Sequence, residues 1–189
     1  MNRLALIPLL SALFMACGSS NNICTTTTEL TDRDHLVSLT PLRTAPELLD
    51  TLAKYPQLQV VRLFDDNYTV GVFANVYFDG LLSFTDTYRL YKSKRDGSVS
   101  SPDRIPSPPN LSHNARITYT EAIRKARQVM EFDSLCISYR LGFFATTPGS
   151  NIPSKYSLAW KIQGANGFPY LILDANSGDV LQRDTGIRY

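Results

Sequence analysis

Histidine is scarce in this chain, and its scarcity excludes the commonest hydrolytic sites. The two histidines are His35 and His113, so the sequence lacks the zinc-binding pair of histidines four residues apart with a glutamate beside the first. A G-x-S-x-G stretch is also absent, and we expect no carboxylate to orient either histidine for serine chemistry. Asp65 and Asp66 resemble an acid pair, but their place before Asn67 favours a role in a turn. The residues therefore predict no enzyme, no bound metal and no cofactor.

A strong excess of charge is absent as well. Lysine and arginine total 19 and aspartate and glutamate 17, for a formal net charge of +2. A near-neutral chain has little general attraction for nucleic acid or for an anionic membrane, so we expect no nucleic-acid partner. The 189 residues, 43% hydrophobic and 19% charged, are typical of one or two globular domains with a buried core.

The N-terminal apolar run is too short to span a bilayer. It covers residues 4–15 behind a basic start, and the small Ala16 precedes Cys17. This pattern predicts a signal peptide over residues 1–16. The stretch around Cys17 also resembles a bacterial lipoprotein cleavage site, at which the cysteine becomes the lipid-bearing first residue, although Phe14 stands where leucine is more usual. The alternative is a plain secretory signal with Cys17 as an incidental thiol.

A lipidated Cys17 would hold the protein on a membrane of the cell envelope. Residues 17–43 begin with a polar stretch that suits a flexible tether behind such an anchor. Gly18 rather than aspartate follows the cysteine, which by analogy favours the outer membrane if the host has two membranes. We therefore expect a lipid-anchored protein of the cell envelope.

The remaining cysteines, Cys24 and Cys136, are an even pair in an exported chain. A disulfide between them would close a loop of about 110 residues, for which the chain-entropy model gives roughly 4 to 5 kcal/mol. The alternative is that Cys136 is a small buried residue while Cys24 is a free thiol. The sequence leaves both alternatives open.

Residues 44–100 have the pattern of a helix followed by a sheet. Thr44 and Glu47 form a capping box, and apolar residues at helical spacing up to Pro56 predict a short amphipathic helix. The chain then alternates between apolar and polar residues, which predicts antiparallel strands separated by tight turns. The strands are expected at 59–64, 68–78, 81–84 and 88–91, with turns at Asp79-Gly80 and Asp96-Gly97.

Aromatic side chains are concentrated in the same stretch. Period-two spacing sends some of them to each face of the sheet. They either form an exposed interaction surface or cover the edges of a small core, and the sequence leaves both roles open. These residues are Tyr68, Phe73, Tyr77, Phe78, Phe84, Tyr88 and Tyr91.

Residues 101–115 form a proline-rich linker ahead of a second unit over residues 116–189. Thr118 and Glu121 make a capping box for a helix whose apolar stripe faces a sheet. Alternation predicts strands at 137–143, 156–163, 170–173 and 180–181, the last three forming an antiparallel meander with one solvated face. The expected fold is α+β, with two tandem small units, each a helix packed on an antiparallel sheet.

Several stretches resemble known modules. ITYTEAIRKARQVM looks like the opening helix of a PepSY domain, and LAWKIQ and PYLILDANSGDVL look like its closing strands, so the resemblance covers about residues 116–184. Upstream, VYFDGLLSFTDTYRLYKSKRDGSV resembles the strand, turn and strand of the fungalysin and thermolysin propeptide module. The two modules follow each other in the propeptide of thermolysin-like metallopeptidases, and PepSY domains also occur alone in bacterial envelope proteins.

The resemblance implies a function. A propeptide covers the cleft of its peptidase, and we expect no peptidase after Tyr189 in this chain. The protein is therefore expected to bind a separately encoded secreted peptidase, as an inhibitor or a folding assistant. The expected contact is the exposed side of the final meander with its tail, through Arg183, Ile187, Arg188 and Tyr189. The alternative is a ligand-binding or structural envelope module with no peptidase partner.

Overall fold

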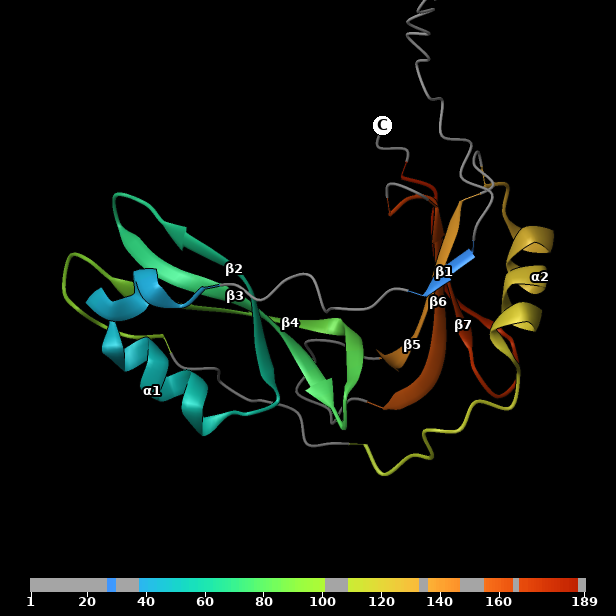
Figure 1. The fold of residues 1–189 in the computed structure, drawn as a ribbon, viewed down its shortest axis with the longest axis horizontal. Helices are drawn as coiled ribbons and strands as arrows, with labels where there is room; N and C mark the ends of the chain where they lie inside the picture. Colours follow the sequence, from blue (N-terminus) through green and yellow to red (C-terminus); the bar gives the residue numbers. More distant parts are fainter. Residues whose placement is uncertain are drawn as a thin grey trace, which may run out of the picture.

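The computed structural model describes residues 27–29, 38–100, 109–132, 136–146, 155–164 and 167–186. These residues form an α+β fold, as the sequence predicts (Figure 1). The described helices are α1 (Pro46–Lys54), α2 (Tyr119–Val129) and a 3-10 helix over Thr40–Thr44. The described strands are β1 (Thr27–Glu29), β2 (Leu58–Asp65), β3 (Thr69–Phe78), β4 (Leu81–Ser93), β5 (Ile137–Ala145), β6 (Tyr156–Gly164), β7 (Tyr170–Asp174) and β8 (Val180–Asp184).

The strands join in one sheet with the order β2-β3-β4-β5-β6-β7-β8, and β1 pairs with β5 beside this path. Neighbours are antiparallel except at β5, where β1 and β4 both pair in parallel. The join between β4 and β5 is short, with Leu82 opposite Gly142 and Ser83 opposite Phe143. In Figure 1, β2 to β4 accordingly run at a steep angle to β5 to β7, although the sheet is continuous.

β4 is one long strand where the sequence predicts two short ones. The hairpin turn before it is confirmed, because Asp79 and Gly80 both have positive φ, 49° and 82°, as a two-residue hairpin loop requires. The pairing of β3 with β4 then breaks after Leu82 and resumes at Thr87. Residues 83–86 therefore bulge out of the ladder, and a bulge turns side chains to new directions.

The two helices begin differently. Thr118 is the N-cap of α2, and its hydroxyl accepts a hydrogen bond from the backbone N–H of Glu121 at 3.3 Å, which confirms the predicted cap. The predicted cap of α1 is wrong, since its N-cap is Ala45 and Thr44 instead ends the 3-10 helix. Pro46 at the first helical position has no N–H and so removes one unpaired donor, and the N–H of Leu48 donates to the Ala45 carbonyl oxygen at 3.0 Å without a side-chain cap.

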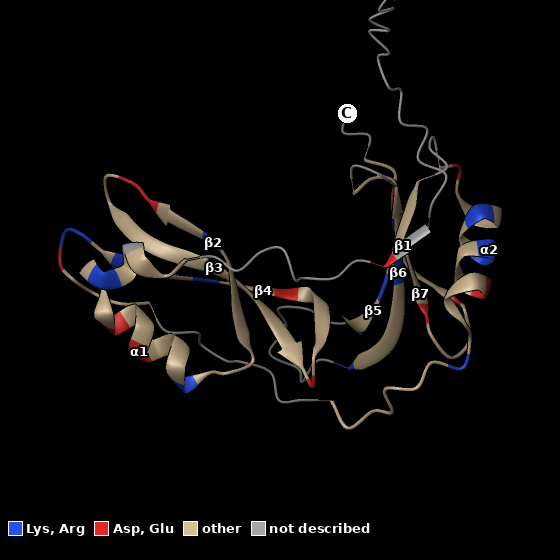
Figure 2. Cartoon of the chain, in the orientation of Figure 1, with Lys and Arg blue, Asp and Glu red and all other residues tan. Residues whose placement is uncertain are grey.

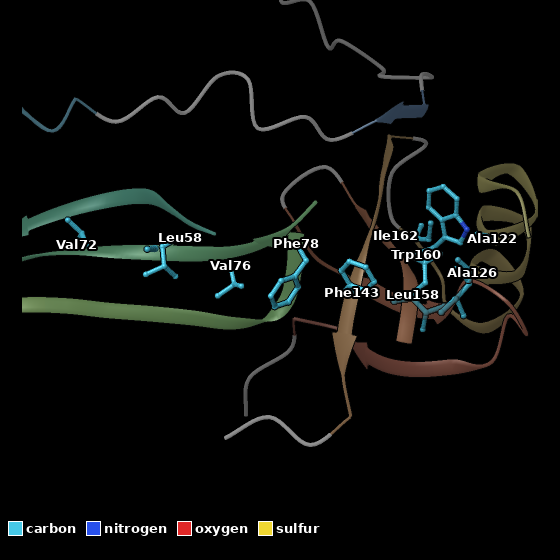
Figure 3. Close-up of a cluster of buried hydrophobic side chains, with 14 of the residues drawn as sticks. Leu58, Val72, Val76, Phe78, Ala122, Ala126, Phe143, Leu158, Trp160 and Ile162 are labelled. Carbon is cyan, nitrogen blue, oxygen red and sulfur yellow. The ribbon is translucent and has the colours of Figure 1, made fainter. Parts of the chain in front are cut away.

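The main core lies on one face of the sheet, beneath both helices. Val72 of β3 and Trp160 of β6 belong to the same apolar cluster. Phe78 and Phe143 join its two ends, with ring centroids 6.0 Å apart in an edge-to-face arrangement, and Figure 3 shows both rings between the two groups of core residues. The indole N–H of Trp160 donates to the Ile117 carbonyl oxygen at 3.0 Å, which fixes the start of α2 on the sheet.

The opposite face of the sheet, turned away from α1 and α2, is here named the open face. The sequence predicts that the final strands have one solvated face, and this prediction is only partly right for the open face. Phe144, Ala159 and Ile172 lie there with exposed fractions of 9%, 0% and 2%, in a second apolar cluster. The physical reason is the bulge in β4, which places the ring of Phe84 over Gly142, where an added Cβ would collide with it.

Candidate interaction surface

The open face carries the cation–π pairs found in the described part of the chain. Strand register places these side chains opposite to the core-facing residues of the same strands. A cation stacked on a ring covers apolar surface while its charge stays near solvent. The pairs are Arg62 with Phe73, Arg89 with Phe64, Phe73 and Tyr91, Arg140 with Tyr77, and Lys161 with Tyr170.

On the final strands, Lys161 and Tyr170 form the centre of this surface. The ammonium nitrogen of Lys161 lies 4.8 Å from the ring centroid of Tyr170. Burial, and next the positive charge of Arg140, lowers the pKa of Lys161. Burial and the carboxylate of Asp184 raise the pKa of Tyr170, whose hydroxyl accepts a hydrogen bond from the Gln182 amide at 2.8 Å. A partly desolvated cation of this kind gains most from an anionic partner that replaces its remaining water.

On β2 to β4, two arginines stack on two phenylalanines. The rings of Phe64 and Phe73 have centroids 5.2 Å apart. The guanidinium carbon of Arg62 lies 4.3 Å from the Phe73 centroid, and that of Arg89 lies 4.5 Å from the Phe64 centroid. Both arginines are exposed. The aromatic residues of this stretch therefore divide between the two roles that the sequence left open, because Phe78 is in the core and Phe73 is on the open face.

A polar cluster occupies the bulge where β4 meets β5. The hydroxyl of Ser83 and that of Tyr156, at 2.9 Å, both donate to the same carboxylate oxygen of Asp86. Thr85 accepts a hydrogen bond from the backbone N–H of Ala145 at 3.1 Å. These bonds link β4 to β5 and β6 beside a ladder of only two residue pairs. Ser83 is 3% exposed and no described histidine joins the cluster, so its evident role is to hold the junction.

His113 is oriented by a carboxylate, contrary to the sequence prediction. Its Nε2 lies 3.6 Å from the Asp79 carboxylate, and its ring packs against the edge of Phe143 at 5.6 Å. The linker returns this residue to the β3–β4 turn, a contact that local sequence does not reveal. His35 lies outside the described residues. Across the described ranges, no three His, Cys, Asp or Glu side chains gather as metal ligands would.

The predicted turn role of Asp66 is confirmed. Its carboxylate accepts hydrogen bonds from the backbone N–H groups of Tyr68 and Thr69 at 2.8 and 2.7 Å. These two bonds, more than any charge, lower the pKa of Asp66. Asp65 points elsewhere and pairs with Lys94 across the end of the sheet.

Of the predicted partner-binding residues, the structure places Arg183. It is exposed on β8, but its register partner is the buried Leu171, so it lies on the α2 side of the sheet edge and not on the open face. Ile187, Arg188 and Tyr189 lie outside the described residues. Phe73 was among the aromatic residues named from the sequence, whereas Lys161 and the two stacked arginines were missed, because a period of two shows which residues share a face but not which face the helices cover.

Cys136 is disulfide-bonded, and its partner lies outside the described residues, as do Cys17 and Cys24. The pairing with Cys24 stays a prediction. It agrees with the strand order, because β1 begins shortly after Cys24 and its Thr27 is aligned with Ile137, the residue after Cys136. None of the helices in the described ranges is long and apolar enough to cross a membrane.

The chain was also compared with known proteins. No family model matches it, and no curated protein matches it. A solved structure, the Bacillus megaterium YpeB C-terminal domain, is similar over 82% of this chain and 69% of that chain, with 16% sequence identity and a TM-score of 0.39. A likeness of this degree carries no argument about the function of this chain.

Proposed function

We propose that this protein is a non-catalytic module of the bacterial cell envelope that binds a separately encoded secreted peptidase, as an inhibitor or a folding assistant. The observation that carries the proposal is the open face of the final strands, where Lys161 is stacked on Tyr170 on the side away from α2. A propeptide acts by presenting a preformed surface to the cleft of the enzyme. Such binding needs a folded sheet and no reactive side chain.

We assign the surface of this protein that contacts the peptidase to Lys161, Tyr170 and the exposed edge of β8 at Arg183. Lys161 is held over a ring and partly desolvated, so it is preorganised for a carboxylate or carbonyl oxygen at low cost in side-chain entropy. The tail beyond β8 extends this contact through Ile187, Arg188 and Tyr189. Gly186 at its start packs against Phe168, since an added Cβ would lie 2.8 Å from the Phe168 Cβ.

Residues 44–100 and 116–189 are proposed to be tandem units, the first propeptide-like and the second PepSY-like. Each contributes a helix to the same side of the sheet, and the apolar cluster that runs through Phe78 and Phe143 makes them fold together. The short ladder between β4 and β5 is the boundary between the units.

The anchor is proposed to be a lipid on Cys17, exposed when the signal peptide of residues 1–16 is removed. The tether behind it would join the folded part at β1, beside β5. In a detergent phase separation, the wild-type protein should enter the detergent phase, and Cys17→Ala should give an uncleaved or aqueous species. Equal partitioning of the two proteins would refute the lipid anchor without affecting the binding proposal.

The binding proposal is tested with the purified protein and the secreted peptidases of the same organism. Hydrolysis of casein by the culture supernatant should slow as the protein is added, and the inhibited peptidase should remain bound to the immobilised protein. A Trp160→Ala variant, whose core is disrupted, should lose inhibition because the surface is no longer formed. If no secreted peptidase is bound, slowed or helped to fold, the proposal fails.

A ligand-binding function is the second candidate, and one feature favours it. A hollow of about 510 Å³ lies against α2 and is lined in part by Tyr119, Ile123, Arg124 and Arg127. Apolar walls with two arginines would suit a small anionic molecule. A rise in the Tm with small anions in a thermal shift screen, with no effect of the protein on any peptidase, would favour this function over the first.

A further inference from the structure

The open face of β2 to β4 contains a row of residues that the proposed peptidase contact does not use. Arg62, Phe73 and Arg89 are directly opposite one another on three neighbouring strands. The two guanidinium carbons lie 4.3 and 5.9 Å from the centroid of the same Phe73 ring. The row therefore holds two positive groups above one aromatic ring, across the first three strands of the sheet.

The floor of this row is fixed by close packing. Phe64 lies across Gly71, where an added Cβ would be 2.6 Å from the ring and 2.3 Å from the Leu90 carbonyl oxygen. Arg89 is further supported by Tyr91, whose ring centroid is 5.5 Å from the guanidinium carbon. Stacked arginines lose less freedom on binding than free ones, because their planar groups are already oriented.

Neither arginine of the row forms an ion pair with a described carboxylate, whereas nearby lysines do. Lys92 pairs with Glu47 at 2.8 Å, and Lys94 pairs with Asp65. Arg62 and Arg89 are both exposed. Each guanidinium can therefore stack on a ring while its N–H groups donate to the carboxylate of a binding partner. Two parallel N–H groups of arginine bind a carboxylate in this bidentate way.

The surroundings of the row limit the size of the anion. Asp65 ends β2, Asp66 and Asp96 lie in the turns at the same end of these strands, and the charge of Arg89 contributes to the lowered pKa of Asp66. A membrane surface or a long polyanion would bring its charges against these carboxylates as well. A short acidic segment can lie on the row and end before the turns.

We propose that this row is a docking surface for a short, extended, acidic segment of a protein partner, with the carboxylates of two alternate residues placed on Arg62 and Arg89. Alternate residues of an extended segment point to the same side and lie about 7 Å apart, which suits two guanidinium groups held above one ring. The surface is distinct from the contact at Lys161, so the inference does not depend on the peptidase.

The test uses a fluorescent peptide of alternating Glu and Thr, the matching peptide of Gln and Thr, and the full-length protein in a mild non-ionic detergent. Anisotropy should show the Glu peptide binding about tenfold or more tightly than the Gln peptide. Raising the salt from about 50 to about 300 mM should weaken it several-fold, because exposed charge pairs are screened.

Matched variants locate the site. Arg62→Gln with Arg89→Gln should lose about tenfold or more in affinity, and Arg43→Gln with Lys54→Gln should change it less than about twofold, although the change in net charge is the same. The second pair is exposed in the 3-10 helix and at the end of α1, where Figure 2 shows basic positions. Circular dichroism and the Tm establish that each variant is folded.

A second variant distinguishes the effect of charge from that of guanidinium geometry, and it replaces the Gln variant if that variant does not fold. Arg62→Lys with Arg89→Lys keeps both charges but loses the planar fork, so it should bind the Glu peptide with reduced affinity. Unchanged affinity in every variant, equal loss in the control at positions 43 and 54, or no binding of the Glu peptide would overturn the proposal. Tighter binding of polyphosphate than of the Glu peptide would overturn it as well.

Discussion

The two parts of the sheet share one way of building a core but differ on their open faces. In β3 and in β6, alternate residues such as Val72 and Trp160 point to the helices and are buried. On the other side, β2 to β4 expose arginines stacked on rings, while β5 to β7 bury Phe144 and Ile172 in a second apolar cluster. The open face of the first part thus keeps charged groups exposed above its rings, whereas that of the second part also stabilises the fold.

The difference follows from where the sequence places its bulge. Residues 83–86 leave the ladder of β3 and β4 and bring Phe84 over β5. Among the described residues, no strand covers Phe73 in this way, and its ring is only partly buried beneath the two arginines. A prediction from period-two alternation alone misses this difference between the two parts, because the difference arises from a contact between strands.

The largest expected effect is on the shared core. Trp160→Ala should lower the free energy of unfolding by about 3 to 5 kcal/mol, because it leaves a cavity and an unpaired Ile117 carbonyl. Because Phe78 and Phe143 join the two ends of the core, urea unfolding followed by far-UV circular dichroism should stay a single transition. Two separate transitions would mean that the two parts of the sheet fold independently. Arg127→Ala, exposed on α2, is the control and should change stability by less than about 0.5 kcal/mol.

The disulfide at Cys136, just before β5, is expected to stabilise the second part of the sheet. With Cys24 as its partner, replacing both by serine should cost about 2 to 5 kcal/mol in unfolding free energy. Mass spectrometry should find the bridged peptide in the wild type and in Cys17→Ser. Alkylation of both Cys24 and Cys136 under native conditions, or loss of the bridge in Cys17→Ser, would contradict this pairing.

The polar junction should have a smaller effect. Asp86→Asn should lower the free energy of unfolding by about 1.5 to 3 kcal/mol, because hydrogen bonds from Ser83 and Tyr156 to a charged carboxylate are weakened. Tyr156→Phe should cost about 1 kcal/mol. In a double-mutant cycle by urea unfolding, the two changes should not be additive, since they remove the same bond. Additive losses would mean that this bond does not join β4 to β6.

The smallest effect concerns the turns of the first part at low pH. Hydrogen bonds from the hydroxyl and backbone N–H of Ser98 lower the pKa of Asp96 to about 2. Since this folded-state pKa is below the unfolded value, the carboxylate stabilises the fold at pH above about 4, and the stabilisation is lost as the pH falls toward about 2. Unfolding in urea across this window should show a shallower decline for Asp96→Asn than for the wild type. Parallel curves would contradict the assignment.

Much of the fold could be predicted because it depends on local patterns. The alternation in β3 and β6 and the cap at Thr118 are properties of neighbouring residues, and the structure confirms them. The cap of α1 could not be predicted, because the preceding 3-10 helix takes Thr44 out of the capping position. The parallel join of β4 with β5 is a contact between distant residues, and no periodicity indicates it.

The candidate surface was harder to predict than the fold. Aromatic residues with period two indicated that some lie on an exposed face, and Phe73 does. The arginines gave no signal of their own, since stacking depends on cross-strand neighbours such as Arg62 and Arg89 around Phe73. The prediction for His113 was wrong for the same reason, because its contact with Asp79 joins residues that are distant in the sequence.

The central claim, that the open face binds a secreted peptidase, is tested most directly by the affinity of the inhibited peptidase for two charge-reversed variants. Lys161→Glu alters the centre of the surface, and Arg127→Glu makes the same change in charge on α2. Surface plasmon resonance should show an affinity loss of roughly tenfold or more for Lys161→Glu and little change for Arg127→Glu. Equal affinities of the two variants, or a greater loss for Arg127→Glu, would contradict the account.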